Sequence, residues 1–292
     1  MDSSEILKRI RKIEIVTRNL VEDIFSGEYH SLFKGQGLEF SEVRAYQEGD
    51  SFKQIDWNVT ARMGHPYIKK FVETRELNVL FLIDSSASTL FGTRDYRKTE
   101  YITEVTAVLS FSALSNNDKV GLLLFTDQKE KFVPPRKGKK NALRILRDIL
   151  YFEPTNTHTD IKQAIEYTYR MTKKRSIIFI VSDFLDSGYE DSLKLLSKKH
   201  DVIALRVIDP TELALPNIGL IHLKDPETGK YITVNTSNKN IREKFDEQAS
   251  EYEAELSEKF KKMNIDLVTL KTNEPYAPTL MKFFKLRRRL QR

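Results

Sequence analysis

The feature that most constrains this chain is a short apolar run, VLFLI at residues 79–83, followed at once by DSSAS at residues 84–88. An uninterrupted apolar run that ends in small polar residues is typical of a strand buried inside a parallel sheet. Asp84, Ser86 and Ser88 leave the strand together, and carboxylate and hydroxyl oxygens suit a hard divalent cation. Open α/β sheets bind their ligands beyond the carboxyl ends of the strands. The segment therefore predicts both a buried strand and a candidate metal site.

Two later segments carry similar side chains at corresponding points. Thr159 lies in the sequence THTD, just before a helical pattern that begins at Ile161. Asp183 follows a second apolar strand pattern, SIIFIVS at residues 176–182. Because the carboxyl ends of parallel strands meet at one edge of a sheet, we expect Thr159 and Asp183 to lie near Asp84.

In this order the residues resemble the von Willebrand factor A fold and its metal-ion-dependent adhesion site. That site takes Asp-x-Ser-x-Ser after the first strand, a Thr from a second loop and an Asp after a later strand. The positions that match its ligands are Asp84, Ser86, Ser88, Thr159 and Asp183. The resemblance implies a bound Mg²⁺, or Mn²⁺ as a substitute. It also implies a protein partner that offers an acidic residue to complete the coordination of the metal.

The alternative for these side chains is ordinary capping, since Ser, Thr and Asp at strand-to-helix turns satisfy free backbone donors. Three segments in the matching order favour the metal site over capping. We expect Asp160 to cap the helix that follows it, and His158 to be a surface residue, because a lone imidazole among hydroxyls rarely binds a hard cation.

Upstream residues narrow the resemblance further. The sequences GQGLEF at residues 35–40, RAYQEGD at 44–50, IDW at 55–57 and AR at 61–62 resemble the domain-of-unknown-function family 58. The similarity extends over roughly residues 30–210. Members of that family carry an A-type domain after this lead-in and often sit genetically beside MoxR-type AAA+ ATPases. The resemblance thus implies a MoxR-type ATPase system as the partner.

Composition limits the class of protein. The 292 residues include no cysteine, which excludes disulfides and thiolate metal sites. No apolar run approaches the roughly 20 residues that a membrane-spanning helix needs, and residues 1–25 have no apolar core of a signal peptide. We therefore expect a soluble, cytoplasmic protein without membrane contact. The net charge of +6 is concentrated in residues 282–292.

Alternating strand and helix patterns from residue 78 onward predict an α/β fold with a doubly wound, mostly parallel, Rossmann-like sheet. The resemblance implies that this sheet is of the von Willebrand factor A type. We expect residues 1–76 to form an N-terminal helix and a β-rich lead-in, and residues 77–292 to form the A-type domain. That domain includes a hairpin near residues 219–234 and a basic C-terminal helix. The predicted helices are 3–26, 97–115, 139–151, 160–172, 189–199, 238–262 and 276–290, and the predicted strands of the domain are 78–83, 119–125, 131–133, 176–182, 201–208 and 265–271.

A dense polar set in the lead-in has two interpretations. One is a docking surface for a partner. The other is a hydrogen-bonded clasp that holds the lead-in to the sheet, for instance through Asp56 and Arg62. We favour the clasp because buried polar groups must form hydrogen bonds with one another. The set consists of Arg44, Tyr46, Asp50, Asp56, Trp57 and Arg62.

The function that these patterns favour is a non-enzymatic, metal-dependent protein-interaction module. The family resemblance implies that such a module acts with a MoxR-type ATPase in the assembly or maturation of other complexes. No phosphate-binding loop of the form GxxxxGK[ST] and no GxSxG or HExxH motif occurs. A magnesium-dependent phosphohydrolase is one alternative, although Ser86 stands where an Asp-x-Asp nucleophile motif has its second carboxylate. Binding of nucleic acid or an anionic surface through the basic tail is another, and we consider it unlikely.

Overall fold

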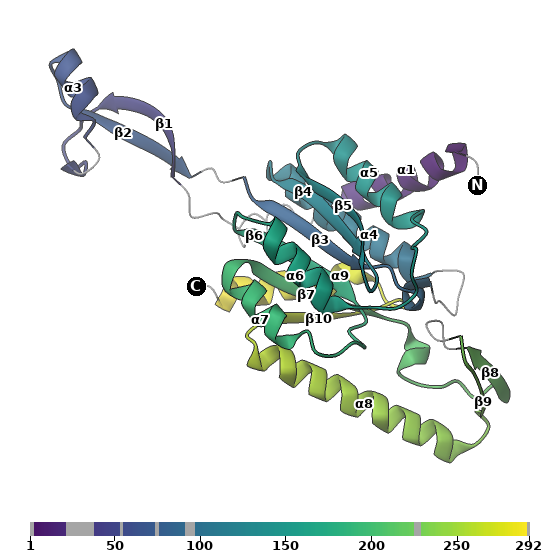
Figure 1. Cartoon of the computed structure of the whole chain (residues 1–292). Coiled ribbons are helices and arrows are strands. Elements are labelled where there is room, and N and C mark those ends of the chain that lie inside the picture. Colours follow the sequence, from purple (N-terminus) through teal and green to yellow (C-terminus); the bar gives the residue numbers. More distant parts are fainter. Residues whose placement is uncertain are drawn as a thin grey trace. The chain divides into compact units, whose positions relative to one another are not determined.

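The computed structural model of the chain describes residues 3–21, 38–52, 55–73, 76–90, 97–224 and 229–290. The chain forms two compact units, one made of residues 1–32 and 78–292 and the other of residues 33–77. The larger unit contains a six-stranded sheet with helices packed against it (Figure 1).

The sheet has the strand order β10-β7-β6-β3-β4-β5. All neighbouring strands are parallel except β5, an edge strand that pairs antiparallel with β4. The strands are β3 (Asn78–Asp84), β4 (Lys119–Phe125), β5 (Lys129–Arg136), β6 (Ser176–Ser182), β7 (Asp201–Ile208) and β10 (Asp266–Lys271).

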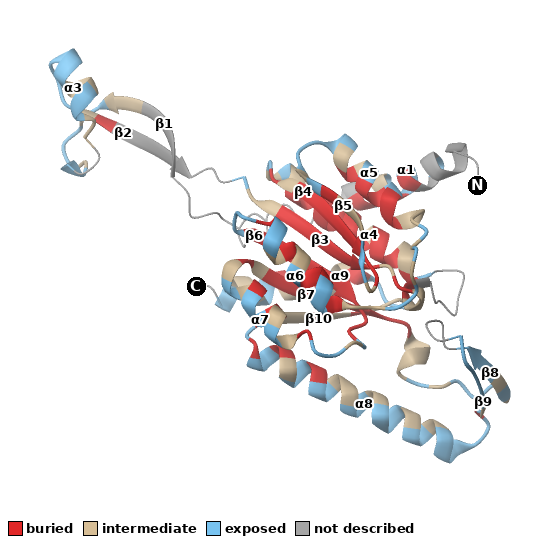
Figure 2. Cartoon of the chain, viewed as in Figure 1, coloured by how far each residue is buried: buried red, intermediate tan, exposed pale blue. Residues whose placement is uncertain are grey.

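The inner strands are apolar on both faces because helices cover both faces. The seven residues of β6 are all buried, and β3 and β4 are buried at every position after the first (Figure 2). Burying each large aliphatic side chain contributes about 1.5–3 kcal/mol, so these strands form the main source of stability. The predicted α/β fold with a mostly parallel sheet is confirmed.

One face of the sheet packs against α6, α7 and the C-terminal half of α8 through a cluster that includes Ile165, Leu193 and Phe260. On the other side, Ile13 of α1 packs with Ala107 of α4 and Leu146 of α5. Tyr276 of α9 meets Tyr101 of α4 edge to face. The helices are α1 (Ser3–Leu20), α4 (Lys98–Ser115), α5 (Lys139–Leu150), α6 (Ile161–Met171), α7 (Glu190–Lys199), α8 (Lys239–Lys262) and α9 (Tyr276–Leu290).

The smaller unit is a two-stranded antiparallel ribbon with a short helix. Its elements are β1 (Leu38–Ala45), α3 (Trp57–Met63) and β2 (Tyr67–Glu73). The strands agree with the predicted β-rich lead-in, but α3 was not predicted. Asp56 caps α3 by accepting hydrogen bonds from the backbone of Asn58 and Val59, and Gly64 ends it in the left-handed conformation. The sequence analysis grouped residues 1–76 together, whereas α1 belongs to the sheet unit because its apolar side chains pack on α4 and α5.

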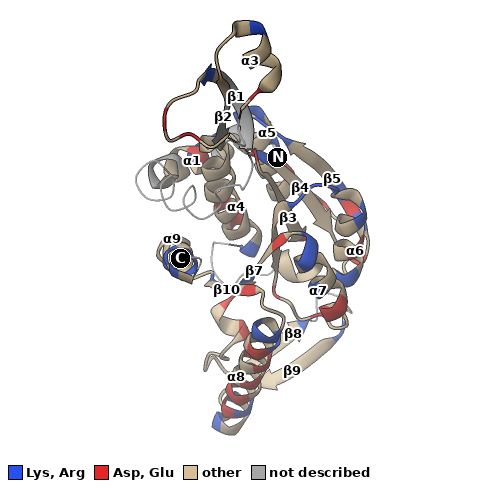
Figure 3. Ribbon diagram, turned by 90° about the vertical axis from the view of Figure 1, so that its left-hand side faces the viewer, with Lys and Arg blue, Asp and Glu red and all other residues tan. Residues whose placement is uncertain are grey.

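The predicted hairpin is present as β8 (Leu220–Lys224) and β9 (Tyr231–Asn235), and its strands pair antiparallel. The long helix α8 follows it and carries both acidic and basic side chains along its length (Figure 3). Residues 22–26 of the predicted first helix and the turn at 225–228 lie outside the described residues. No helix in the described part of the chain is long and apolar enough to cross a membrane.

Candidate metal site

Adjacent parallel strands bring the two predicted carboxylates to one edge of the sheet. Asp84 is the last residue of β3, and Asp183 follows the last residue of β6, its direct neighbour in the sheet. The hydroxyl of Ser182 donates a hydrogen bond of 2.8 Å to Asp84 Oδ2 and accepts one of 3.1 Å from the Phe184 amide. This bridge fixes the orientation of the Asp84 carboxylate.

The loop after β3 folds back on that carboxylate. The Ser86 amide donates to Asp84 Oδ1 at 2.9 Å, and the hydroxyl oxygens of Ser86 and Ser88 lie 3.0 Å apart. The Asp84 and Ser86 side chains are only 1% and 0% exposed. Three of the predicted ligands are therefore gathered in one cluster, in which Asp84 and Ser86 are buried and Ser88 is half-buried.

The second loop reaches the first through its backbone. The Ala87 amide donates to the Thr157 carbonyl at 3.1 Å, and the Asp160 amide donates to the Thr126 carbonyl at 3.1 Å. The first bond places the loop of Thr159 beside the loop of Ser86 and Ser88, and the second holds it against the end of β4. The Asp160 side chain accepts a hydrogen bond from the Gln163 amide, so its predicted role as the cap of α6 is confirmed.

The environment of Asp84 disfavours its charged form, because the carboxyl is buried and lies near the carboxylate of Asp183. The pKa of Asp84 is raised to about 7, mainly by burial and then by the negative charge of Asp183. The two carboxylates repel each other in this buried setting, and a divalent cation between them would relieve the repulsion.

A lysine that the sequence analysis did not single out lies beside this pair. Lys98, the first residue of α4, is 1% exposed. Its ammonium is 3.6 Å from Asp183 Oδ2 and 2.6 Å from Glu212 Oε1. Burial raises the pKa of Glu212, and the charge of Lys98 opposes that rise. The sequence pointed to Lys98 only through its position, because the helix that follows β3 begins near the same edge of the sheet.

The predicted ligands suit a hard cation because all of them are oxygen donors, although only two of them carry a negative charge. Among the described residues, no group of three or more His, Asp or Glu side chains could hold a metal ion. The predicted set has two carboxylates, Asp84 and Asp183, so it depends on the oxygens of Ser86, Ser88 and Thr159 and on water. All-oxygen sites of this kind suit Mg²⁺ and Mn²⁺, since Mg²⁺ retains several waters in protein sites.

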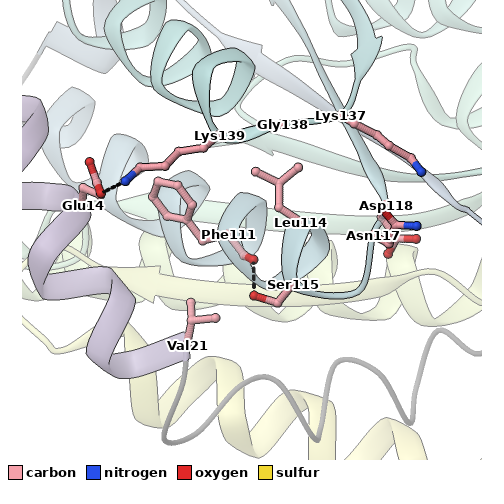
Figure 4. Close-up of a pocket in the computed structure, with 10 residues that line it drawn as sticks. All are labelled: Glu14, Val21, Phe111, Leu114, Ser115, Asn117, Asp118, Lys137, Gly138 and Lys139. Atoms are coloured by element: carbon pink, nitrogen blue, oxygen red, sulfur yellow. Dashed lines mark hydrogen bonds and ion pairs between the residues drawn. The ribbon is translucent and has the colours of Figure 1, made fainter.

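A separate cavity of about 560 Å³ lies between α1, α4 and the start of α5. Figure 4 shows its apolar floor, with Phe111 and Leu114, and the ion pair of Glu14 with Lys139 at its rim. None of the predicted metal ligands lines it.

Comparison with protein families gives a match over most of the chain. The family described as "Protein of unknown function DUF58" matches residues 42–255. The chain belongs to this family. An uncharacterized protein of Mycobacterium tuberculosis is 27% identical over 292 residues, covering 99% of this chain and 92% of the relative. The uncharacterized protein YeaD of Bacillus subtilis is 32% identical over 107 residues, which are 37% of this chain and 25% of YeaD.

Among solved structures, the conserved hypothetical protein BatB from Bacteroides thetaiotaomicron matches with 16% identity and a TM-score of 0.47. The match covers 73% of this chain and 99% of BatB.

Proposed function

We propose that this member of the DUF58 family is a protein-interaction module of the von Willebrand factor A type, and that it binds its partner through a divalent cation. The observation that carries the proposal is the pair of carboxylates, Asp84 and Asp183, at the ends of adjacent central strands, with the hydroxyls of Ser86 and Ser88 beside them. The antiparallel edge strand β5 and the helices on both faces of the sheet are compatible with that fold type.

Asp84, Ser86, Ser88, Thr159 and Asp183 would hold the cation, which would supply Lewis acidity toward an incoming oxygen ligand. The chain's own residues orient that site: Ser182 fixes Asp84, and the Ala87–Thr157 bond fixes the two loops against each other. Three of the five ligands are neutral hydroxyls, and the Lys98 ammonium, 3.6 Å from Asp183 Oδ2, offsets part of the negative charge of the two carboxylates. A carboxylate from a partner is therefore a favourable further ligand.

By family resemblance, we propose that the partner belongs to a MoxR-type AAA+ ATPase system, and that the complex serves the assembly or maturation of other proteins. This step rests on analogy between family members, since one fold can carry many functions.

The proposal is tested by capture of the protein's partner from its own cell extract, with and without chelator, followed by identification of the bound protein. We expect capture to require Mg²⁺ and to be lost in Ser86→Ala. The neighbouring Ser85→Ala, which removes a hydroxyl outside the proposed ligand set, is the matched control and should behave as wild type. Because Ser86 is fully buried, each variant's unfolding is measured in parallel.

Capture of the same partner in chelator, or by Ser86→Ala that is folded, would contradict the proposal. Metal-dependent hydrolysis of a generic phosphate ester, lost in Asp84→Asn, would favour a phosphohydrolase instead.

A further inference from the structure

Lys98 occupies an unusual position for a lysine, because its side chain is almost fully buried. Lysine is rarely found in protein interiors unless its charge is paired. Here the ammonium has two carboxylate neighbours, Glu212 Oε1 at 2.6 Å and Asp183 Oδ2 at 3.6 Å. One neighbour is a proposed metal ligand and the other is not.

Glu212 is held in place independently of Lys98. It ends a short 3₁₀ helix, Pro210–Glu212, and its Oε2 accepts a hydrogen bond of 2.8 Å from the Asp209 amide in a capping box. The Asp183 side chain is fixed on the other side, where its Oδ1 accepts a hydrogen bond of 3.3 Å from the Leu185 amide. The lysine therefore stands between two anchored carboxylates.

Asp183 and Glu212 also line one cavity of about 200 Å³, together with Phe245 and Tyr252 of α8. The Lys98 ammonium is within reach of both carboxylates, and a small rotation of its side chain brings it closer to either one. The flexible stem of lysine allows such a shift without movement of the backbone.

The charges have opposite effects on a divalent cation. The ammonium beside Asp183 supplies positive charge where the cation would bind, so it repels the cation and competes for the carboxylate. Glu212 draws the ammonium away from Asp183 and offsets its charge.

We propose that Lys98 is a built-in counter-cation, shared between Asp183 and Glu212, that sets the affinity of the site for a divalent metal ion. The inference rests on the proposed metal site and adds to it a residue pair that keeps the affinity low enough for the ion to exchange. In the metal-free protein Lys98 pairs with both carboxylates. When the site is filled it pairs with Glu212 alone.

The experiment is calorimetric titration of the full chain with MnCl₂ and MgCl₂ at constant pH and ionic strength. Lys98→Met removes the competing charge and should tighten binding on the order of tenfold, as expected for unit charges a few ångströms apart in a partly buried site. Glu212→Gln keeps an acceptor for the Asp209 amide but releases the ammonium toward Asp183, so it should weaken binding by a similar factor. The two variants thus move the affinity in opposite directions.

A matched pair of surface variants controls for the substitutions themselves. Lys262 and Glu258 form an exposed ion pair of 2.7 Å on α8, and Lys262→Met and Glu258→Gln should leave the affinity unchanged. The double variant Lys98→Met/Glu212→Gln covers the case in which Lys98→Met leaves Glu212 buried without a partner and fails to fold. It should bind the metal more tightly than Glu212→Gln.

Equal weakening by Lys98→Met and Glu212→Gln would overturn the inference, since both residues would then act only as structural supports. Unchanged affinity in both, or a double variant that binds no more tightly than Glu212→Gln, would also overturn it while leaving the metal site in place. Failure of the wild-type protein to bind either ion would overturn the metal site and the role of Lys98 together.

Discussion

Ser182 Oγ lies 2.8 Å from Asp84 Oδ2 and joins the last residue of β6 to the last residue of β3. Both side chains are 1% exposed, so the bond is shielded from water. The bond therefore ties β6, which leads into Asp183, to the Asp84 carboxylate.

Ser182→Ala should lower the free energy of unfolding by about 1–3 kcal/mol, because it leaves a buried carboxylate oxygen and the Phe184 amide without their shared partner. Urea unfolding followed by circular dichroism measures the change. Ser250→Ala, at an exposed position of α8, is the control and should stay within about 0.5 kcal/mol of wild type. Equal stability of Ser182→Ala and wild type would contradict the geometry at the strand ends.

Most of the features at the carboxyl ends of β3 and β6 could be predicted from the sequence. The run at residues 79–83 predicted β3, and the parallel arrangement predicted that Asp84 and Asp183 would meet at one edge. The pairing of Lys98 with Glu212 could not be predicted, because it joins residues 114 positions apart and depends on how α4 and the segment after β7 dock. The burial of Asp84 and Ser86, at 1% and 0% exposure, was likewise not predicted from the sequence.

The helix α3 was missed for a different reason. It is only seven residues long and has no buried residue, so it shows no apolar periodicity. Its end signals were nevertheless present in the sequence, since Asp56 and Gly64 occupy the N-terminal and C-terminal capping positions. Among the described residues of the lead-in, Arg44 and Asp50 form an ion pair with two nitrogen–oxygen distances of 2.8 and 2.9 Å.

Trp57→Ala should change the melting temperature by less than about 2 °C, because the indole is 69% exposed. This reverses the expectation from the sequence that Trp57 is part of a stabilising clasp. Ile68→Ala is the comparison: this β2 side chain is 3% exposed, and its truncation should cost about 2–5 kcal/mol locally. Limited proteolysis detects local opening of the smaller unit and therefore compares the two variants. A loss of protection in Trp57→Ala as large as in Ile68→Ala would show that the indole is buried in solution.

Acid should destabilise the protein through His200. This imidazole is 2% exposed, and among the described residues neither ring nitrogen has a hydrogen-bond partner. Burial lowers its pKa to about 4, with Lys199 and Arg175 adding to the effect. The unfolded chain takes up the proton near pH 6.5. The contribution of His200 to the free energy of unfolding is therefore fully present above about pH 6.5. It falls by on the order of 2 kcal/mol as the pH is lowered toward 4.

His200→Leu should remove that part of the pH dependence, measured as unfolding free energies between pH 7 and pH 4.5. His65→Leu, at an exposed histidine, should keep the wild-type slope. An unchanged slope in His200→Leu would assign the acid sensitivity to other groups.

Arg287 of the basic tail is docked against the sheet. Arg287 is 14% exposed at its side chain and pairs with Asp201 and Asp266, on the strands β7 and β10. Given these pairs, Arg287→Ala should destabilise the protein by about 1–2 kcal/mol in urea unfolding, whereas Arg289→Ala, at an exposed position, should be neutral. Equal stability of the two variants would contradict the docking of Arg287.

The most direct test of the account is a titration of the purified protein with MnCl₂ and MgCl₂ in a calorimeter. We predict one binding site in the wild-type chain and none in Asp84→Asn or Asp183→Asn, each of which replaces a carboxylate by an amide of the same shape. Asp191→Asn, on the exposed surface of α7, should bind as wild type. Binding of equal strength in wild type and Asp84→Asn, or no binding by the wild-type chain, would contradict the proposed metal site.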